Sequence, residues 1–572
     1  MGRRFGSFAF LVVLVFAGCG PTAGTTSRGG EPAGATSPSS PSRALVMAVR
    51  YEVVGLAPKR LEAAASEWTK RPFNASLAVV DGSGTRQPYL AESLPRLDTD
   101  SWKVSADGKM ETTYHLKPNL TWHDGQPLTA DDFVFAEQIY ATKALGVFTS
   151  SPQDQIEGIV AVDQRTILIR WSGLYGEAGA LVSGMLEPLP KHILEALFAV
   201  YQQDPSTTDT FLSHPFWTTQ YVGLGPYKLA EWQQGVQFDG AAFDGHALGR
   251  PKIDRVVIRV FQDENTVVSN VLAGNVDIAG DRAIRPEHSQ EIKRQLGDNG
   301  VSLVFPGGRH YLGFQLRPEL QKTPALLDLR VRRALAHALD RDVINQAMYD
   351  GEGPMGDHWV PPGLPYYEEV ERSVTHYPFD PRRAQELMAD AGFTRDASGF
   401  FASASGERFR PQLMVDGSNL FEREMTTVLD TWAKIGIDGE PKLLPAVESR
   451  LLSARTTYPG IYGISTGLRE NQLDIFSSAQ IASEARGWAG NNRVGWSNPE
   501  YDRAWNAFNS LLDRGRRDQQ IVQMMRVATG QLPAIMVHFN PSATAFRRPL
   551  RGPEAGGPET LPNWNMTEWT LN

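Results

Sequence analysis

The stretch Trp122-His123-Asp124-Gly125-Gln126-Pro127-Leu128-Thr129-Ala130-Asp131-Asp132 is the most informative part of the chain. Its last four residues form a variant of the capping box, in which Thr129 and the acid three residues later open a helix, predicted here over 133–141. Segments 112–116 and 166–170 on either side alternate apolar and polar residues, as strands do. A helix between strands is therefore expected around this stretch.

The same alternation of strands and helices continues along the chain. The pattern predicts strands over 44–54 and 255–261 and helices over 264–273, 328–349, 381–391 and 501–512. The helix over 328–349 has the most regular apolar stripe, and Asn498-Pro499 and Asp380-Pro381 are typical helix starts. Interleaved strands and helices indicate an α/β fold rather than a sandwich or a bundle.

Composition limits the functions that this chain can have. Its 572 residues predict two or three domains, and 41% hydrophobic with 21% charged residues is typical of a folded globular protein. The formal charge of −9, without a basic stripe, argues against binding to nucleic acid. Cys19 is the single cysteine, so an intramolecular disulfide is excluded.

The N-terminus indicates export. Arg3 and Arg4 precede an apolar run over 8–17, which is too short to span a bilayer but fits a signal peptide over 1–18. The segment Phe16-Ala17-Gly18-Cys19 resembles a bacterial lipobox, so we expect Cys19 to carry a lipid. An ordinary signal peptide or a buried strand is the alternative. Residues 19–43, rich in Gly, Pro, Ser and Thr, are expected to be a disordered tether.

Catalytic and metal motifs are weak. Gly463-Ile464-Ser465-Thr466-Gly467 matches the nucleophile elbow of serine hydrolases, with Asp474 and His538 following in hydrolase order. That elbow requires a helix to start at the serine, and none is predicted there. The histidines show no H-E-x-x-H spacing. We therefore expect no enzyme activity, no cofactor and no metal, and keep a secreted hydrolase that uses Ser465 as an alternative.

Several ordered motifs resemble the family 5 extracellular solute-binding proteins, the peptide- and nickel-type binding lipoproteins of ABC importers. Besides 122–132, they are 89–93, 114–118, 223–229, 251–255, 272–277, 331–342, 379–392 and 495–502. Gly223-Leu224-Gly225-Pro226-Tyr227 is similar to a G-T-G-P-Y motif of that family. The resemblance covers about 45–550.

The resemblance implies a periplasmic-binding-protein-like fold, with two α/β lobes, a hinge and a smaller inserted domain. The implied ranges are 44–78, 215–280 and 539–572 for lobe I, 79–214 for the inserted domain, and 281–538 for lobe II. A monomer would hold a peptide-like or other small solute between the lobes and deliver it to a membrane permease with ATPase subunits. It would be exported and lipid-anchored on the outer side of the cytoplasmic membrane. A ligand sensor of the same fold that does not transport is a further alternative.

One segment departs from the peptide-binding pattern. The resemblance implies that the aspartate that pairs with a peptide's amine is replaced by Leu468, which disfavours a free ammonium group. Arg469 beside it would favour an anionic group, unless Glu470 or Asp474 takes the pairing role. The predicted ligand-binding residues are Arg50, Tyr51, Tyr311, Trp359, Arg469, Asp474, Trp488 and Arg493.

Overall fold

The computed structural model describes residues 44–60, 67–145, 152–280, 282–445, 447–557 and 560–572. The predicted signal peptide, Cys19 and tether lie outside these residues. The helices are α1 Glu67–Lys70, α2 Ala130–Tyr140, α3 Lys191–Gln203, α4 Thr208–Leu212, α5 Glu264–Ala273, α6 Pro286–Leu296, α7 Leu329–His337, α8 Arg341–Tyr349, α9 Tyr367–Ser373, α10 Pro381–Asp390, α11 Asn419–Ile435, α12 Pro499–Ser510 and α13 Arg514–Gln531. In the part of the chain that is described, no helix is both long enough and apolar enough to cross a membrane.

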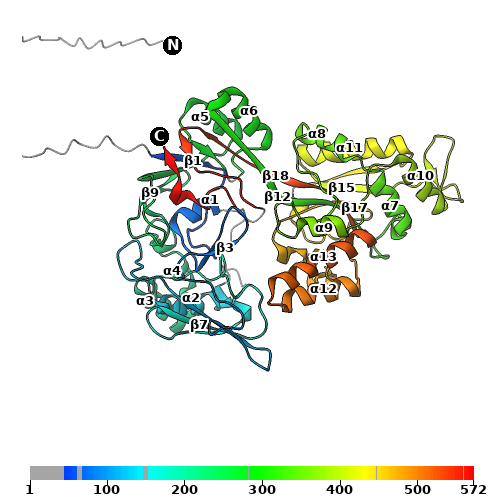
Figure 1. The fold of residues 1–572 in the computed structure, drawn as a ribbon. Helices are drawn as coiled ribbons and strands as arrows, with labels where there is room; N and C mark the ends of the chain where they lie inside the picture. The colour runs from blue at the N-terminus through cyan, green and yellow to red at the C-terminus, as the bar shows by residue number, and fades with distance from the viewer. Residues whose placement is uncertain (1–43, 61–66, 146–151, 281, 446, 558–559) are drawn as a thin grey trace, which may run out of the picture. The chain divides into compact units, whose positions relative to one another are not determined.

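A ten-stranded mixed sheet organises the body of the protein, and several of its strands are labelled in Figure 1. Its strand order is β16-β15-β17-β12-β18-β11-β1-β10-β9-β8. Its strands are β1 Leu45–Val49, β8 Tyr227–Gln233, β9 Gln237–Ala242, β10 Arg255–Val260, β11 Ile278–Ala279, β12 Gly300–Phe314, β15 Gln412–Asp416, β16 Glu440–Leu444, β17 Ile461–Thr466 and β18 Ala534–Arg547. Parallel and antiparallel pairs both occur, as in many α/β proteins.

Two long antiparallel strands, β12 and β18, join the two halves of this sheet. The C-terminal half of β12 pairs with β17, and the C-terminal end of β18 pairs with β11. Their register shifts between Pro306 and Gly308 and again between His310 and Tyr311. Because such irregularities bend a strand locally, they lie where the chain passes from one half of the sheet to the other.

A separate four-stranded sheet lies within 79–214, in the order β4-β5-β7-β6. Its strands are β4 Trp102–Val104, β5 Met110–His115, β6 Ile156–Ala161 and β7 Thr166–Trp171. Helix α2 packs on this sheet, and its N-cap Thr129 forms the predicted capping box with Asp132. The short pairs are β2 Ala78–Val80 with β3 Arg86–Pro88, β13 Thr394–Arg395 with β14 Phe401–Ala402, and β19 Leu550–Arg551 with β20 Thr570–Leu571.

The half of the large sheet around β15 and β17 has a core on each face. Helices α7, α8, α10 and α11 bury one core, and α12 and α13 bury the other (Figure 1). Successive residues of a strand point to opposite faces. Tyr311 of β12 accordingly lies in the core with α12 and α13, whereas His310 packs against Phe421 of α11.

The predicted helix over 328–349 is wrong in one respect, since it is two helices, α7 and α8. The Asp340 carboxylate accepts a hydrogen bond from the Val343 amide at 3.1 Å and caps α8. This local cap ends the continuous helix although the apolar stripe runs through the break. The predictions for α5, α10 and α12 are confirmed, with caps at Asp263, Asp380 and Asn498.

Candidate functional site

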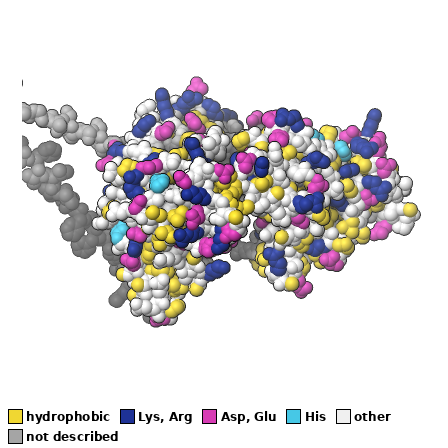
Figure 2. All heavy atoms as spheres, turned by 60° about the horizontal axis from the view of Figure 1, so that its bottom comes forward, with side chains coloured by type: hydrophobic (Ala, Val, Ile, Leu, Met, Phe, Trp, Pro, Cys, Tyr) yellow, Lys and Arg dark blue, Asp and Glu magenta, His cyan; other side chains and the backbone are white. Residues whose placement is uncertain are grey.

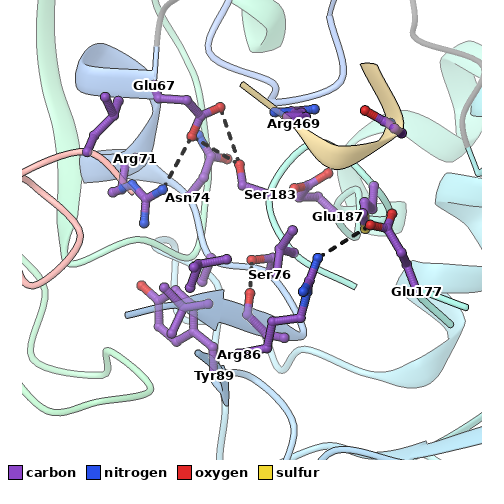
Figure 3. Close-up of a pocket in the computed structure, with 18 of the residues that line it drawn as sticks. Glu67, Arg71, Asn74, Ser76, Arg86, Tyr89, Glu177, Ser183, Glu187 and Arg469 are labelled. Carbon is purple, nitrogen blue, oxygen red and sulfur yellow. Dashed lines mark hydrogen bonds and ion pairs between the residues drawn. The ribbon is translucent and has the colours of Figure 1, made fainter. Parts of the chain in front are cut away.

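The segment 465–471, which starts in β17, lines two cavities. The first cavity places Arg469–Asn471 opposite side chains from the N-terminal part of the chain (Figure 3). Its polar lining includes Glu67, Arg71, Asn74, Ser76, Arg86, Tyr89, Glu177, Ser183 and Glu187. The second cavity, of about 610 Å³, is lined by 465–467 together with residues that include Tyr51, Glu264, Arg285, Asp416, Phe421 and Asn540–Ala543. The second cavity thus lies at strands β12, β17 and β18 of the large sheet, and the first lies between the loop after β17 and the segments 67–89 and 177–187.

Most charged groups of the first cavity already have partners. Arg86 lies 3.4 Å from a Glu177 oxygen, and Arg71 lies 3.8 Å from Glu67, which also accepts a hydrogen bond from Ser183 (Figure 3). Arg469 differs, because its exposed guanidinium makes no ion pair with any residue that the structure describes. It is therefore a cation available to an incoming ligand.

The backbone beside Arg469 is held by a buried arginine that the sequence analysis missed. Arg309 of β12 is 1% exposed and donates hydrogen bonds to the carbonyl oxygens of Trp359 at 2.6 Å and Leu468 at 2.8 Å. It also donates to the Gly467 carbonyl and, at 3.4 Å, to that of Arg469. A guanidinium suits this task because its donors are fixed in one plane. Arg309 thus holds the backbone of 467–469 from the interior of the protein.

The acids near Arg469 are engaged elsewhere. Glu470 is ion-paired with Arg514 at 2.5 Å and accepts a hydrogen bond from the Tyr366 hydroxyl at 2.8 Å. Asp474 is buried, its Oδ2 accepts from Asn491 at 2.8 Å, and burial raises the pKa of Asp474. Leu468 is buried in the core of this half of the sheet. Arg469 and Glu470 both line the first cavity, and of these two Arg469 is the one without an ion pair to any residue that the structure describes.

The other predicted ligand residues are spread over three environments. Tyr51 lines the second cavity, and Arg50 beside it pairs with Glu264 at 2.7 Å. Tyr311 and Trp359 are 1% and 0% exposed and pack against each other in the core.

The last two lie on the loop before α12. Trp488 is half-buried with a left-handed backbone (φ 64°), and Arg493 is half-buried. Of the predicted ligand residues, Arg469 therefore lines the first cavity and Tyr51 lines the second. Tyr311 and Trp359 lie in the core.

Ser465 is not on a nucleophile elbow. It lies inside β17, and the chain continues as a loop and a 3₁₀ helix over Glu470–Phe476, not an α-helix. Its hydroxyl is 2.9 Å from Nδ1 of His310 and accepts a hydrogen bond from Asn540 at 3.3 Å. The partners predicted from chain order, Asp474 and His538, make no hydrogen bond with Ser465 among the described residues.

Glu187, which is buried, and Glu137, which is half-buried, are expected to make the stability of the protein depend on pH. Burial raises the pKa of Glu137 and of Glu187 to about 7, and burial lowers the pKa of nearby Lys59 to about 8. Glu187 lines the first cavity. Between the ordinary glutamate pKa and pH 7 the folded protein holds more protons than the unfolded chain, so these glutamates make stability fall as pH rises.

Glu137→Gln should therefore flatten the pH dependence of stability. Gln cannot ionise, so the fall in denaturation midpoint between pH 5 and pH 7 should be smaller than in the wild type. Glu195→Gln, at an exposed position of α3, is the control and should keep the wild-type slope. Equal slopes in all three proteins would contradict the assignment to Glu137.

On the face of the protein shown in Figure 2, neither positively nor negatively charged side chains predominate. Lys and Arg side chains alternate with Asp and Glu over the visible face. Such a surface does not offer the continuous basic stripe that a nucleic-acid backbone requires.

Comparison with known proteins places the chain in a family. Residues 92–483 match "Bacterial extracellular solute-binding proteins, family 5 Middle". The chain is 24% identical over 493 residues to the oligopeptide-binding protein AppA of Bacillus subtilis, covering 84% of this chain and 83% of the relative. It is 25% identical over 490 residues to heme-binding protein A of Haemophilus influenzae, covering 82% of each. The structure of NikA from Brucella suis in complex with Fe(III)-EDTA aligns with a TM-score of 0.73 at 18% identity, covering 92% of this chain and 100% of that one.

The chain belongs to the family 5 extracellular solute-binding proteins. The expected fold, mixed α/β and periplasmic-binding-protein-like, is confirmed. The chain is the solute-binding component of an ABC import system.

Proposed function

We propose that this protein captures a small solute whose anionic group binds at Arg469 in the first cavity, which has a volume of about 120 Å³. Arg469 recognises the anion by bidentate hydrogen bonding, for which a guanidinium is well suited. The observation that carries this proposal is the exposed Arg469, which makes no ion pair with any described residue and lies on a segment to which Arg309 donates hydrogen bonds. A preformed charged group binds at a lower entropic cost than one that must first be ordered.

The contacts around Arg469 disfavour recognition of a free amine at this position. Glu470 and Asp474 are both buried and hydrogen-bonded within the protein, and Leu468 carries no charge. An ammonium group placed beside Arg469 would meet a like charge, while the carboxylates of Glu470 and Asp474 already have protein partners. The relatives' names, oligopeptide-binding and heme-binding, are consistent with a family that takes varied solutes.

The N-terminal sequence and the family support a proposal for where the protein works. We propose that Cys19 is lipidated after export and that residues 19–43 tether a monomer to the outer side of the cytoplasmic membrane. The loaded protein would then deliver its solute to a permease in the same membrane, with ATPase subunits on the other side.

Native mass spectrometry of the protein from its own source, combined with thermal shifts, tests the proposal. A solute that binds only the folded state stabilises it by about 2.7 kcal/mol at a hundred times its dissociation constant. We expect a co-purifying or added solute that carries a carboxylate or another anion to raise the denaturation midpoint. The panel of added solutes contains peptides, opines, amino sugars and metal chelates. If only the cationic solutes of this panel stabilised the protein, the proposal would be contradicted.

A further inference from the structure

A buried cluster of two histidines and one glutamate lies outside the first cavity. His310 of β12 and His538 of β18 are 1% and 0% exposed, and Glu424 of α11 is 1% exposed. The two imidazoles are opposite each other on neighbouring strands and stack with ring centroids 4.9 Å apart. Residues opposite one another on adjacent strands share a face of the sheet, and here α11 brings Glu424 onto that face.

The distances within this cluster fit metal coordination. His310 Nε2 lies 3.2 Å from Glu424 Oε1, and His538 Nε2 lies 3.2 Å from Glu424 Oε2. In a tetrahedral zinc site, bonds of about 2.0–2.1 Å place neighbouring ligand atoms about 3.3 Å apart. One ligand atom from each of the three residues lies within 4.8 Å of the others. The cluster therefore presents three converging ligands of the types that zinc prefers.

Hydrogen bonding leaves part of this buried cluster unsatisfied. Although His310 Nε2 and Glu424 Oε1 face each other, neither makes an aligned hydrogen bond with any residue that the structure describes. The Tyr349 hydroxyl is also buried there without such a partner, and its ring edge lies against His538, with centroids 5.3 Å apart. Buried polar atoms without partners cost free energy, and a cation bound by the nitrogen and the carboxylate would remove that cost.

An outer partner fixes the His310 ring. Nδ1 of His310 lies 2.9 Å from the Ser465 hydroxyl, so donation from Nδ1–H leaves the Nε2 lone pair directed at the cluster. Metal-bound histidines almost always donate their other nitrogen in this way. Ser465, Phe421 and Tyr349 all line the second cavity, which gives a route to the cluster through one layer of side chains.

We propose that His310, Glu424 and His538 bind a divalent transition-metal ion of the zinc type. The Tyr349 hydroxyl supplies a polar partner for a water in the fourth position. Such an ion ties β12 and β18, the two strands shared by both halves of the large sheet, to helix α11. The site is structural, separate from the solute-binding cavity, and does not depend on the identity of the solute.

Cobalt titration of the untagged, chelator-treated protein tests the site. Tetrahedral Co²⁺ absorbs visible light, so one equivalent of Co²⁺ should produce a visible absorption band, and Zn²⁺ should abolish the band and raise the denaturation midpoint. A wild-type protein that shows neither the band nor a Zn²⁺ stabilisation overturns the proposal, whether or not any variant folds.

Variants locate the ion. Glu424→Gln and His310→Asn should abolish the band, and Ser465→Ala, which removes only the outer partner, should weaken binding about 10–100-fold. His376→Asn is the control, because His376 belongs to a second, more exposed group with Asp357 and Glu371. Loss of the band in His376→Asn, or its persistence in folded Glu424→Gln, would assign the ion elsewhere and overturn the proposal.

Discussion

Arg309→Ala should release the segment 467–469 and abolish solute binding. Arg309 donates hydrogen bonds to four carbonyl groups, those of Trp359, Gly467, Leu468 and Arg469. Alanine would leave several of these buried acceptors without a donor, at about 1–3 kcal/mol each. We expect a loss of about 3–5 kcal/mol in unfolding free energy, measured by denaturant titration, together with loss of solute binding.

Two further variants separate release of the segment from general destabilisation. Val537→Ala truncates a side chain with 0% exposure in the core of β18 but does not touch 467–469. Trypsin should cut after Arg469 much faster in Arg309→Ala than in Val537→Ala. Arg309→Lys should not restore the wild-type cleavage rate. A guanidinium holds its donors in one plane and reaches several carbonyl groups at once, whereas a single ammonium does not. Equal cleavage rates in Arg309→Ala and Val537→Ala would show that Arg309 does not hold the segment.

Gly225→Ala should destabilise the protein by about 3 kcal/mol or more. A Cβ at this position would lie 2.3 Å from the Asn74 amide nitrogen and 2.4 Å from both Phe73 C and Pro72 O. These are backbone atoms, so no side-chain rotation can relieve the clash. The amides of Leu224 and Gly225 also donate to the Phe73 carbonyl at 3.2 and 3.1 Å, which fixes this close approach.

Gly173→Ala is the matched control for Gly225→Ala. A Cβ at Gly173 would meet no heavy atom within 4 Å, and its backbone is not left-handed. We expect Gly173→Ala to have the wild-type denaturation midpoint and Gly225→Ala to be largely insoluble or to unfold early. Wild-type stability of Gly225→Ala would mean that the backbone at 72–74 moves away at little cost.

Local signals made most elements of the fold predictable. The caps of α2, α5, α10 and α12 lie within a few residues of the helices that they start, so one short stretch of sequence holds the whole signal. The break between α7 and α8 was missed because one apolar stripe serves both helices, and only the cap at Asp340 marks it.

The candidate site was less predictable because its contacts are distant in sequence. Arg309 is 159 residues from Leu468, and no local pattern marks an arginine inside a strand as an anchor for a loop. Tyr311 was predicted to contact the ligand, yet the alternation of β12 directs its side chain into the core. His310, Glu424 and His538 share no spacing motif, since the sheet register and α11 alone bring them together.

The affinity of the Arg469→Ala variant tests the central claim most directly. For a solute that stabilises the wild type, loss of the charged hydrogen bonds, about 1.5–3 kcal/mol, should weaken binding about 10–100-fold in isothermal titration. Arg503→Ala, at an exposed position of α12, is the control and should bind as the wild type does. Amidating the solute's carboxylate should weaken wild-type binding by a similar factor and leave Arg469→Ala unaffected. Wild-type affinity in Arg469→Ala would contradict recognition of an anionic solute at this wall.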